Sequence, residues 1–265
     1  MGRGRTCLSA LVASLLVSGM ALRSDEAIAQ SSTEQVPHHI VALTTSHNLL
    51  AADPNAIARF LETARPARVS AEDKARVLST LPLEGEVTDL SGSARQKLAA
   101  LTKVLRATGR ESVYEIKVID VPQAAIGLHA RAVILISEPA LTLLDADELQ
   151  ALVAHEIGHE YVWTERERAF QLADRSRLKD LELMCDGIAI VTLHGLGMDV
   201  SRLMVGIQKI SRFNREGFGP ANNERDYPTL ARRQAFARAM AARSAEAIAD
   251  PAEVTAFRSQ ERSPR

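Results

Sequence analysis

The stretch Ala-His-Glu-Ile-Gly-His at residues 154–159 decides the fold of this chain. Its two histidines, His155 and His159, stand four positions apart, with Glu156 between them. On an α-helix, residues i and i+4 lie above one another on the same face. Both imidazoles can then bind one Zn²⁺, while Glu156 lies beside the open coordination position of the metal. The pattern predicts a hydrolytic zinc site, in which the metal acidifies a water and the glutamate takes its proton.

The residues around the motif predict the helix that this geometry requires. Asp145 is expected to cap the helix, and Glu148 follows three residues later to complete a capping box. Apolar side chains then recur at helical spacing, at Leu149, Leu152, Val153 and Ile157. The alternative is two solvated histidines with an unrelated acid between them. The context disfavours it, and so does the scarcity of histidine, with 7 in 265 residues.

A hydrolytic zinc site needs a third protein ligand and one position for water. Glu182 is the best candidate, because it lies in an apolar helical segment where a buried carboxylate needs a partner. Asp186 follows one helical turn later and is expected to orient a histidine ligand. Asp180 is the competing ligand. Cys185 lies between these acids and is either a redox-active thiol or, by preference, a small buried hydrophobe.

The first 29 residues have the features of a signal peptide. Two arginines precede an apolar run over residues 7–22, and Ala27-Ile-Ala29 forms an A-x-A cleavage site. The run is short for a spanning helix. We therefore expect cleavage before Gln30 and a periplasmic or secreted protein with no membrane span, whereas an uncleaved anchor is the alternative.

The charge and the cysteine content narrow the classes of protein to which the sequence can belong. The net charge is −1, so no basic excess points to nucleic acid. Loss of Cys7 with the signal would leave Cys185 as the only cysteine, which allows no intramolecular disulfide. His38 and His39 are expected to be exposed, with an inhibitory contact to the metal as the alternative.

Periodicity outlines the elements along the chain. It predicts helices in three pieces over 52–109, a strand over 112–120, a turn plus a second strand over 125–136 and a short helix over 137–144. The strand before the zinc helix is well placed to hold an extended peptide by edge pairing. The alternative is an ordinary sheet strand, and the two are compatible. Beyond the motif come a charged segment (164–180), a helix around 181–190, another from Asp199, a long loop (214–228) and a helix over 229–243.

Two motifs carry a resemblance to a known family. Asp-Glu-Leu-Gln-Ala-Leu-Val-Ala-His-Glu-Ile-Gly-His at 147–159, followed by Glu-x-x-x-Asp at 182–186, resembles the M48 (Ste24/HtpX-like) metallopeptidases. Arg-Ala-Val-Ile-Leu-Ile-Ser-Glu-Pro-Ala-Leu before the motif and Tyr-Pro-Thr-Leu-Ala-Arg-Arg at 227–233 are similar to further family elements. The resemblance covers about residues 125–240. The membrane helices of integral members are absent, which suggests a soluble exported relative.

The resemblance implies roles for individual residues. His155, His159 and Glu182 would bind one Zn²⁺ per chain, Asp186 would support a ligand, and Glu156 would act as the base. Tyr227 stands where the family often has a histidine. A donor for the tetrahedral oxyanion is also needed, and the candidates are Tyr227, His194 and Arg233.

The combined interpretation is an α+β, mainly helical fold: a gluzincin-like zincin domain with a small sheet beside the motif helix. We expect a signal peptide (1–29), a helical N-terminal region packed on the catalytic domain (30–110), the zinc metallopeptidase domain (111–245) and a C-terminal tail (246–265). The expected function is a zinc endopeptidase acting on polypeptides of exported or envelope proteins, with no nucleic-acid partner. The alternatives are a cell-wall peptide amidase and a non-catalytic zinc-containing chaperone or binding protein.

Overall fold

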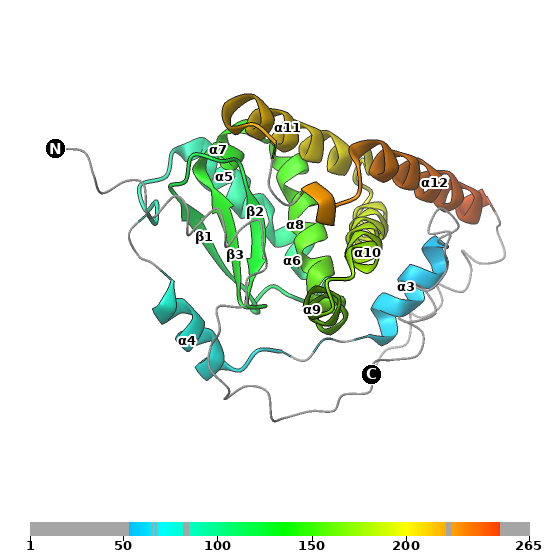
Figure 1. Cartoon of the computed structure of the whole chain (residues 1–265), viewed down its shortest axis with the longest axis horizontal. Coiled ribbons are helices and arrows are strands. Elements are labelled where there is room, and N and C mark those ends of the chain that lie inside the picture. Colours follow the sequence, from blue (N-terminus) through cyan, green and yellow to red (C-terminus); the bar gives the residue numbers. More distant parts are fainter. Residues whose placement is uncertain (1–52, 65, 67, 82–84, 221–223, 250–265) are drawn as a thin grey trace, which may run out of the picture.

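Helix α8 (Ala146–Tyr161), which carries both histidines, lies between a small sheet and the helices of the C-terminal half (Figure 1). The computed structural model describes residues 53–64, 66, 68–81, 85–220 and 224–249. The expected signal peptide and the pair His38 and His39 lie outside these residues. Within them, no helix combines the length and the apolar character needed to cross a membrane.

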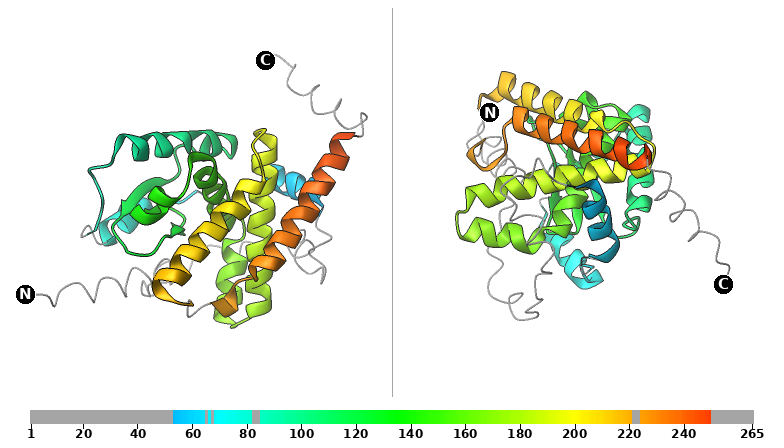
Figure 2. Two further views of the ribbon diagram at one scale, coloured as in Figure 1. Left: turned by 90° about the horizontal axis from the view of Figure 1, so that it is seen from above. Right: turned by 90° about the vertical axis from the view of Figure 1, so that its right-hand side faces the viewer.

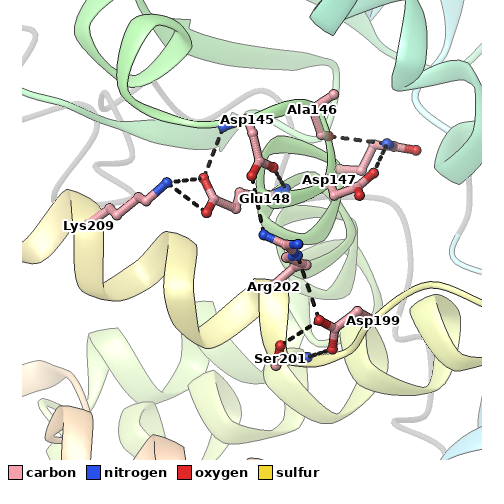
Figure 3. Close-up of polar contacts among 9 residues, drawn as sticks. Asp145, Ala146, Asp147, Glu148, Asp199, Ser201, Arg202 and Lys209 are labelled. Carbon is pink, nitrogen blue, oxygen red and sulfur yellow. Dashed lines mark hydrogen bonds and ion pairs between the residues drawn. The ribbon is translucent and has the colours of Figure 1, made fainter.

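The start of α8 is held by a polar cluster that Figure 3 shows. The expected capping box is present: the Asp145 side chain accepts from the Glu148 backbone N–H, and the Glu148 side chain accepts from the Asp145 N–H. Helix α11 (Ser201–Phe218) adds Lys209, whose Nζ donates to the buried Glu148 carboxylate at 2.8 Å, and Arg202, which contacts Asp145 at 3.3 Å. A buried carboxylate needs such partners, so α11 fixes the helix that bears the histidines.

Helix α10 (Arg175–Gly195) crosses α8 at close range. A Cβ added at Gly158 would lie 3.0 Å from Cα of Cys185, which is closer than side chains normally pack. The absence of a side chain at Gly158 therefore lets the two helices approach. This crossing brings the histidines of α8 opposite Glu182 and Asp186 of α10.

The sheet consists of β1 (Glu115–Ile119), β2 (Ile126–His129) and β3 (Val133–Ser137) in the order β1-β3-β2. β1 runs parallel to β3, and β2 runs antiparallel to it. The prediction of a turn plus a single strand over 125–136 was wrong, because this stretch is a hairpin in which β2 and β3 are both strands. Its turn residues Ala130 and Arg131 have φ of 46° and 58°. Such turns usually contain glycine or asparagine, so no residue at these positions indicated a turn.

The hairpin also corrects the expectation about edge pairing. The strand before the motif helix, β3, is the central strand, and each of its edges is occupied. The strand that lies against α8 is β2, at the border of the sheet. An extended peptide would therefore have to pair with β2.

The remaining helices surround these elements. They are α3 (Pro54–Thr63), α4 (Ala71–Thr80), α5 (Gly92–Ala100), α6 (Thr102–Ala107), α7 (Glu138–Leu143), α9 (Trp163–Gln171), the 3₁₀ turn η2 (Glu224–Asp226) and α12 (Leu230–Ala249). Helices α10, α11 and α12 lie side by side (Figure 2). One hydrophobic core joins Ile57 and Phe60 of α3 to Ile188 of α10. The domain division at residue 110 stays a prediction.

Two further elements differ from the expectation in their bounds. The helix expected around 181–190 begins earlier, because α10 starts at Arg175 within the charged segment 164–180. The first part of that segment is α9, and a turn at Ala173 with φ of 53° separates the two helices. The long loop expected over 214–228 is shorter, since α11 continues to Phe218 and ends at Gly219 with φ of 79°. In both segments, charged residues lie on helices that pack against neighbouring helices: α9 against α10, and α11 against α8 and α12. The mainly helical α+β fold with a small sheet beside α8 is confirmed.

Candidate metal centre

The side chains of His155, His159 and Glu182 converge between α8 and α10. Nε2 of His155 lies 3.4 Å from one Glu182 carboxylate oxygen, and Nε2 of His159 lies 3.7 Å from the other. The two imidazole rings meet edge to face with their centroids 4.9 Å apart. All three residues are at least nine-tenths buried.

These separations fit shared metal ligation better than hydrogen bonding. Contacts of 3.4 and 3.7 Å are too long for good N–H···O bonds. Donors around a tetrahedral zinc, with bonds of about 2.0–2.1 Å, are about 3.4 Å apart. Two imidazole nitrogens and a carboxylate are also ligands that zinc prefers. The residues present therefore fit a zinc ion, and potential ligand atoms of His155, Glu156 and His159 lie within 4.8 Å of one another.

Each imidazole has a partner on its other nitrogen. Oδ1 of Asp186 lies 2.9 Å from Nδ1 of His155, which fixes the tautomer with Nε2 free to face Glu182. Both oxygens of Asp186 accept from the Arg233 guanidinium, with Nε donating at 2.8 Å. Sγ of Cys185 lies 3.4 Å from Nδ1 of His159. The buried thiol thus packs behind one histidine, and burial raises its pKa well above the ordinary value.

The electrostatics of the metal-free centre favour ionised Glu182. Burial by itself would raise the pKa of Glu182, but His159 and His155 outweigh it and lower the pKa. Burial would lower the pKa of His155, yet the hydrogen bond to Asp186 and the nearby Glu182 carboxylate raise it to about 9. For His159, burial dominates and lowers the pKa to about 3. When no metal is bound, both ring nitrogens of His155 therefore carry a proton at neutral pH.

Glu156 points toward the sheet. Its Oε2 accepts from the backbone N–H of Leu128 in β2 at 3.0 Å. Burial raises the pKa of Glu156 to about 7. A carboxylate with such a pKa can take up and release a proton near neutral pH.

The other candidates from the sequence are placed as follows. Tyr227 is half-buried, and desolvation of its hydroxyl together with the Glu182 charge raises its pKa, so its hydroxyl stays protonated. Arg233 lies on the Nδ1 side of His155, and its guanidinium is engaged by Asp186. The structure therefore argues against Arg233 as an oxyanion donor and makes it a support for Asp186.

His194 and Asp180 lie away from the centre. His194 is exposed and lies twelve residues after Glu182 on α10, about 18 Å along a helix axis. That distance contradicts its prediction as an oxyanion donor. Asp180 accepts from Arg232 at 3.0 Å instead of facing the histidines, so the structure brings Glu182, not Asp180, to them.

Sequence reasoning missed Arg166 of α9. Its Nε lies 4.0 Å from Oε1 of Glu182, and its side chain is 23% exposed. No motif marks it, because its position depends on how α9 folds back beside α10.

Two helices that present paired histidines, a third ligand candidate and an adjacent glutamate define a protein of the metallopeptidase class. The comparison with known families identifies which one. Residues 92–209 match the model of peptidase family M48, so this segment, from α5 into α11, is an M48 domain. Membership of this family implies metallopeptidase activity and a polypeptide substrate. No curated protein matched the sequence.

Proposed function

We propose that this chain is a zinc endopeptidase that acts on exported or envelope proteins. The observation that carries the proposal is the convergence of His155, His159 and Glu182 at ligand spacing, with Glu156 beside them. His155, His159 and Glu182 would hold the ion, and Asp186 would orient His155. The signal-like N-terminus supports a periplasmic or secreted location.

The zinc would acidify a water and polarise the scissile carbonyl. Glu156 would accept the proton from that water and return it to the leaving amine. The Leu128 N–H positions the carboxylate for this transfer by holding one of its oxygens. A general base typically increases the reaction rate by a factor of about 10²–10⁴. Loss of Glu156 should therefore slow peptide hydrolysis while zinc binding is retained.

The border strand β2 offers a place for an extended substrate. The Leu128 N–H points to Glu156 and thus away from β3. In an antiparallel pair, successive residues direct their backbone groups to alternate sides, so the backbone groups of Ile126 share this outward direction. A peptide paired with them would lie beside Glu156, and such main-chain pairing holds the peptide in an extended conformation.

The test compares wild-type protein with Glu156→Gln, using exposed Glu167→Gln of α9 as a matched control. Bound zinc is counted, and cleavage of a fluorescently labelled unfolded protein is measured. We expect one zinc per chain in all three, with cleavage at least about a hundredfold slower only in Glu156→Gln. Equal cleavage by all three would remove the proposal. Release of cell-wall peptides without protein cleavage would favour the amidase, and zinc binding without either reaction would favour the non-catalytic protein.

A further inference from the structure

Arg166 is the cation at the centre whose hydrogen-bonding capacity is unused. Its Nε is 4.0 Å from Glu182, beyond hydrogen-bond length, and among the described residues its guanidinium makes no hydrogen bond. Other enclosed arginines behave differently. Arg177 donates to Glu165 at 2.7 Å, and Arg233 donates from two nitrogens to Asp186. Those arginines hold the fold together, whereas Arg166 retains donors for another group.

The groups around Arg166 belong to the candidate metal centre. Its guanidinium lies 4.0 Å from Glu182 and interacts electrostatically with Glu182, Tyr227, Cys185 and Glu156. Glu156 faces β2, where a substrate would lie. The guanidinium of Arg233 is engaged by Asp186, whereas that of Arg166 is not. With a side chain that is 23% exposed, Arg166 is enclosed but accessible.

We propose that Arg166 binds the scissile carbonyl oxygen of the substrate and stabilises the negative charge that develops on it. This inference rests on the proposed peptidase function. As the water oxygen bonds to the carbonyl carbon, the C=O electron pair moves to oxygen, and the water proton passes to Glu156. The electron pair on oxygen then re-forms the C=O bond of the carboxylic acid as the C–N bond breaks, the C–N electron pair stays on nitrogen, and the proton from Glu156 completes the amine. A preorganised guanidinium is most effective at the first step, where charge appears on oxygen.

The experiment compares Arg166→Gln, Arg166→Lys and Arg166→Ala with Arg168→Gln, an exposed arginine of the same helix. The substrate is an internally quenched peptide with an amidated C-terminus. We expect Arg166→Gln to lower kcat about 10²–10³-fold, the effect of removing one oxyanion donor, with KM within about threefold and zinc content unchanged. Arg166→Lys should retain part of the activity, added guanidinium should restore part of it to Arg166→Ala, and Arg168→Gln should match wild type.

A peptide in which a phosphonate replaces the scissile bond gives a readout independent of turnover. Its affinity for Arg166→Gln should fall by about the factor lost in kcat/KM, since it resembles the tetrahedral state. Zinc loss in Arg166→Gln would overturn the proposal and assign Arg166 to holding Glu182. A defect confined to peptides with a free C-terminal carboxylate would overturn it in favour of terminal recognition. If the wild type cleaves no peptide, the proposed peptidase function fails. The phosphonate still tests the role of Arg166, because equal affinity for wild type and Arg166→Gln would overturn that role.

Discussion

Gly158 of α8 faces Cα of Cys185 in α10 so closely that a Cβ at Gly158 would lie 3.0 Å from it. This contact sets the separation of the two helices that bear the candidate ligands. His155 and His159 flank it on α8, while Glu182 and Asp186 flank it on α10. The distance between the helices at this one crossing therefore controls whether histidine and carboxylate groups can share an ion.

Gly158→Ala should destabilise the protein and weaken zinc binding. The methyl group would meet the backbone of α10, which cannot move aside as a flexible side chain can, and overpacking of this kind costs about 1–3 kcal/mol. Gly217→Ala is the control, because nothing lies within 4 Å of a Cβ added at this exposed helical position. The control should be stabilised by up to about 1 kcal/mol. Urea unfolding measures both, and unchanged stability of Gly158→Ala would refute the close crossing.

Arg233→Met should cost about 3–5 kcal/mol of stability, because it leaves the buried carboxylate of Asp186 without its cation. It should also weaken zinc binding, because Asp186 orients His155. The neighbouring Arg232→Met loses a partly exposed pair with Asp180 and should cost no more than about 1 kcal/mol. The measurements are chemical denaturation and chelator competition. Similar losses for the two variants would contradict the buried role of Arg233.

Zinc should stabilise the protein more as pH rises from 6 to 9. The pKa of His155 in the metal-free protein is raised from 6.5 to about 9, so its contribution to stability is complete below 6.5 and is lost as pH rises through 9. Glu156, raised from 4.5 to about 7, acts in the same direction at lower pH. A proton on His155 must leave before zinc binds. Zinc affinity should therefore rise about tenfold per pH unit between 7 and 9, where one proton is released per ion bound.

Calorimetry of zinc binding in buffers with different ionisation enthalpies counts the released protons, and thermal unfolding with and without zinc gives the stability difference. An increase in Tm that is the same at pH 6.5 and pH 8.5 would show that no proton competes with the metal.

Lys209→Met should destabilise the start of α8 by about 1–3 kcal/mol, since Glu148 is buried and would lose its charged donor (Figure 3). Lys103→Met of α6, which replaces an exposed lysine, should change stability by no more than about 0.5 kcal/mol. Hydrogen exchange locates the effect: faster exchange in the first turns of α8 is expected for Lys209→Met. Exchange that stays at the wild-type rate there would mean that α11 does not anchor this helix.

Much of the site could be predicted from local sequence. The i, i+4 spacing placed His155 and His159 on one face, and the capping box at Asp145 marked where α8 begins. The same spacing related Glu182 to Asp186 on α10. The hairpin could not be predicted in this way, because Ala130 and Arg131 adopt left-handed backbone conformations without the residues that usually mark them.

The amino-acid sequence alone determined the helices, their caps and the face that carries the histidines, because these depend on residues within a few positions of one another. Tertiary structure decided which groups meet: Cys185 behind His159, Arg233 on Asp186, Arg166 beside Glu182 and β2 at the border of the sheet. The physical reason is distance along the chain. Contacts between separate helices depend on how closely those helices pack, and here a glycine at position 158 permits the approach.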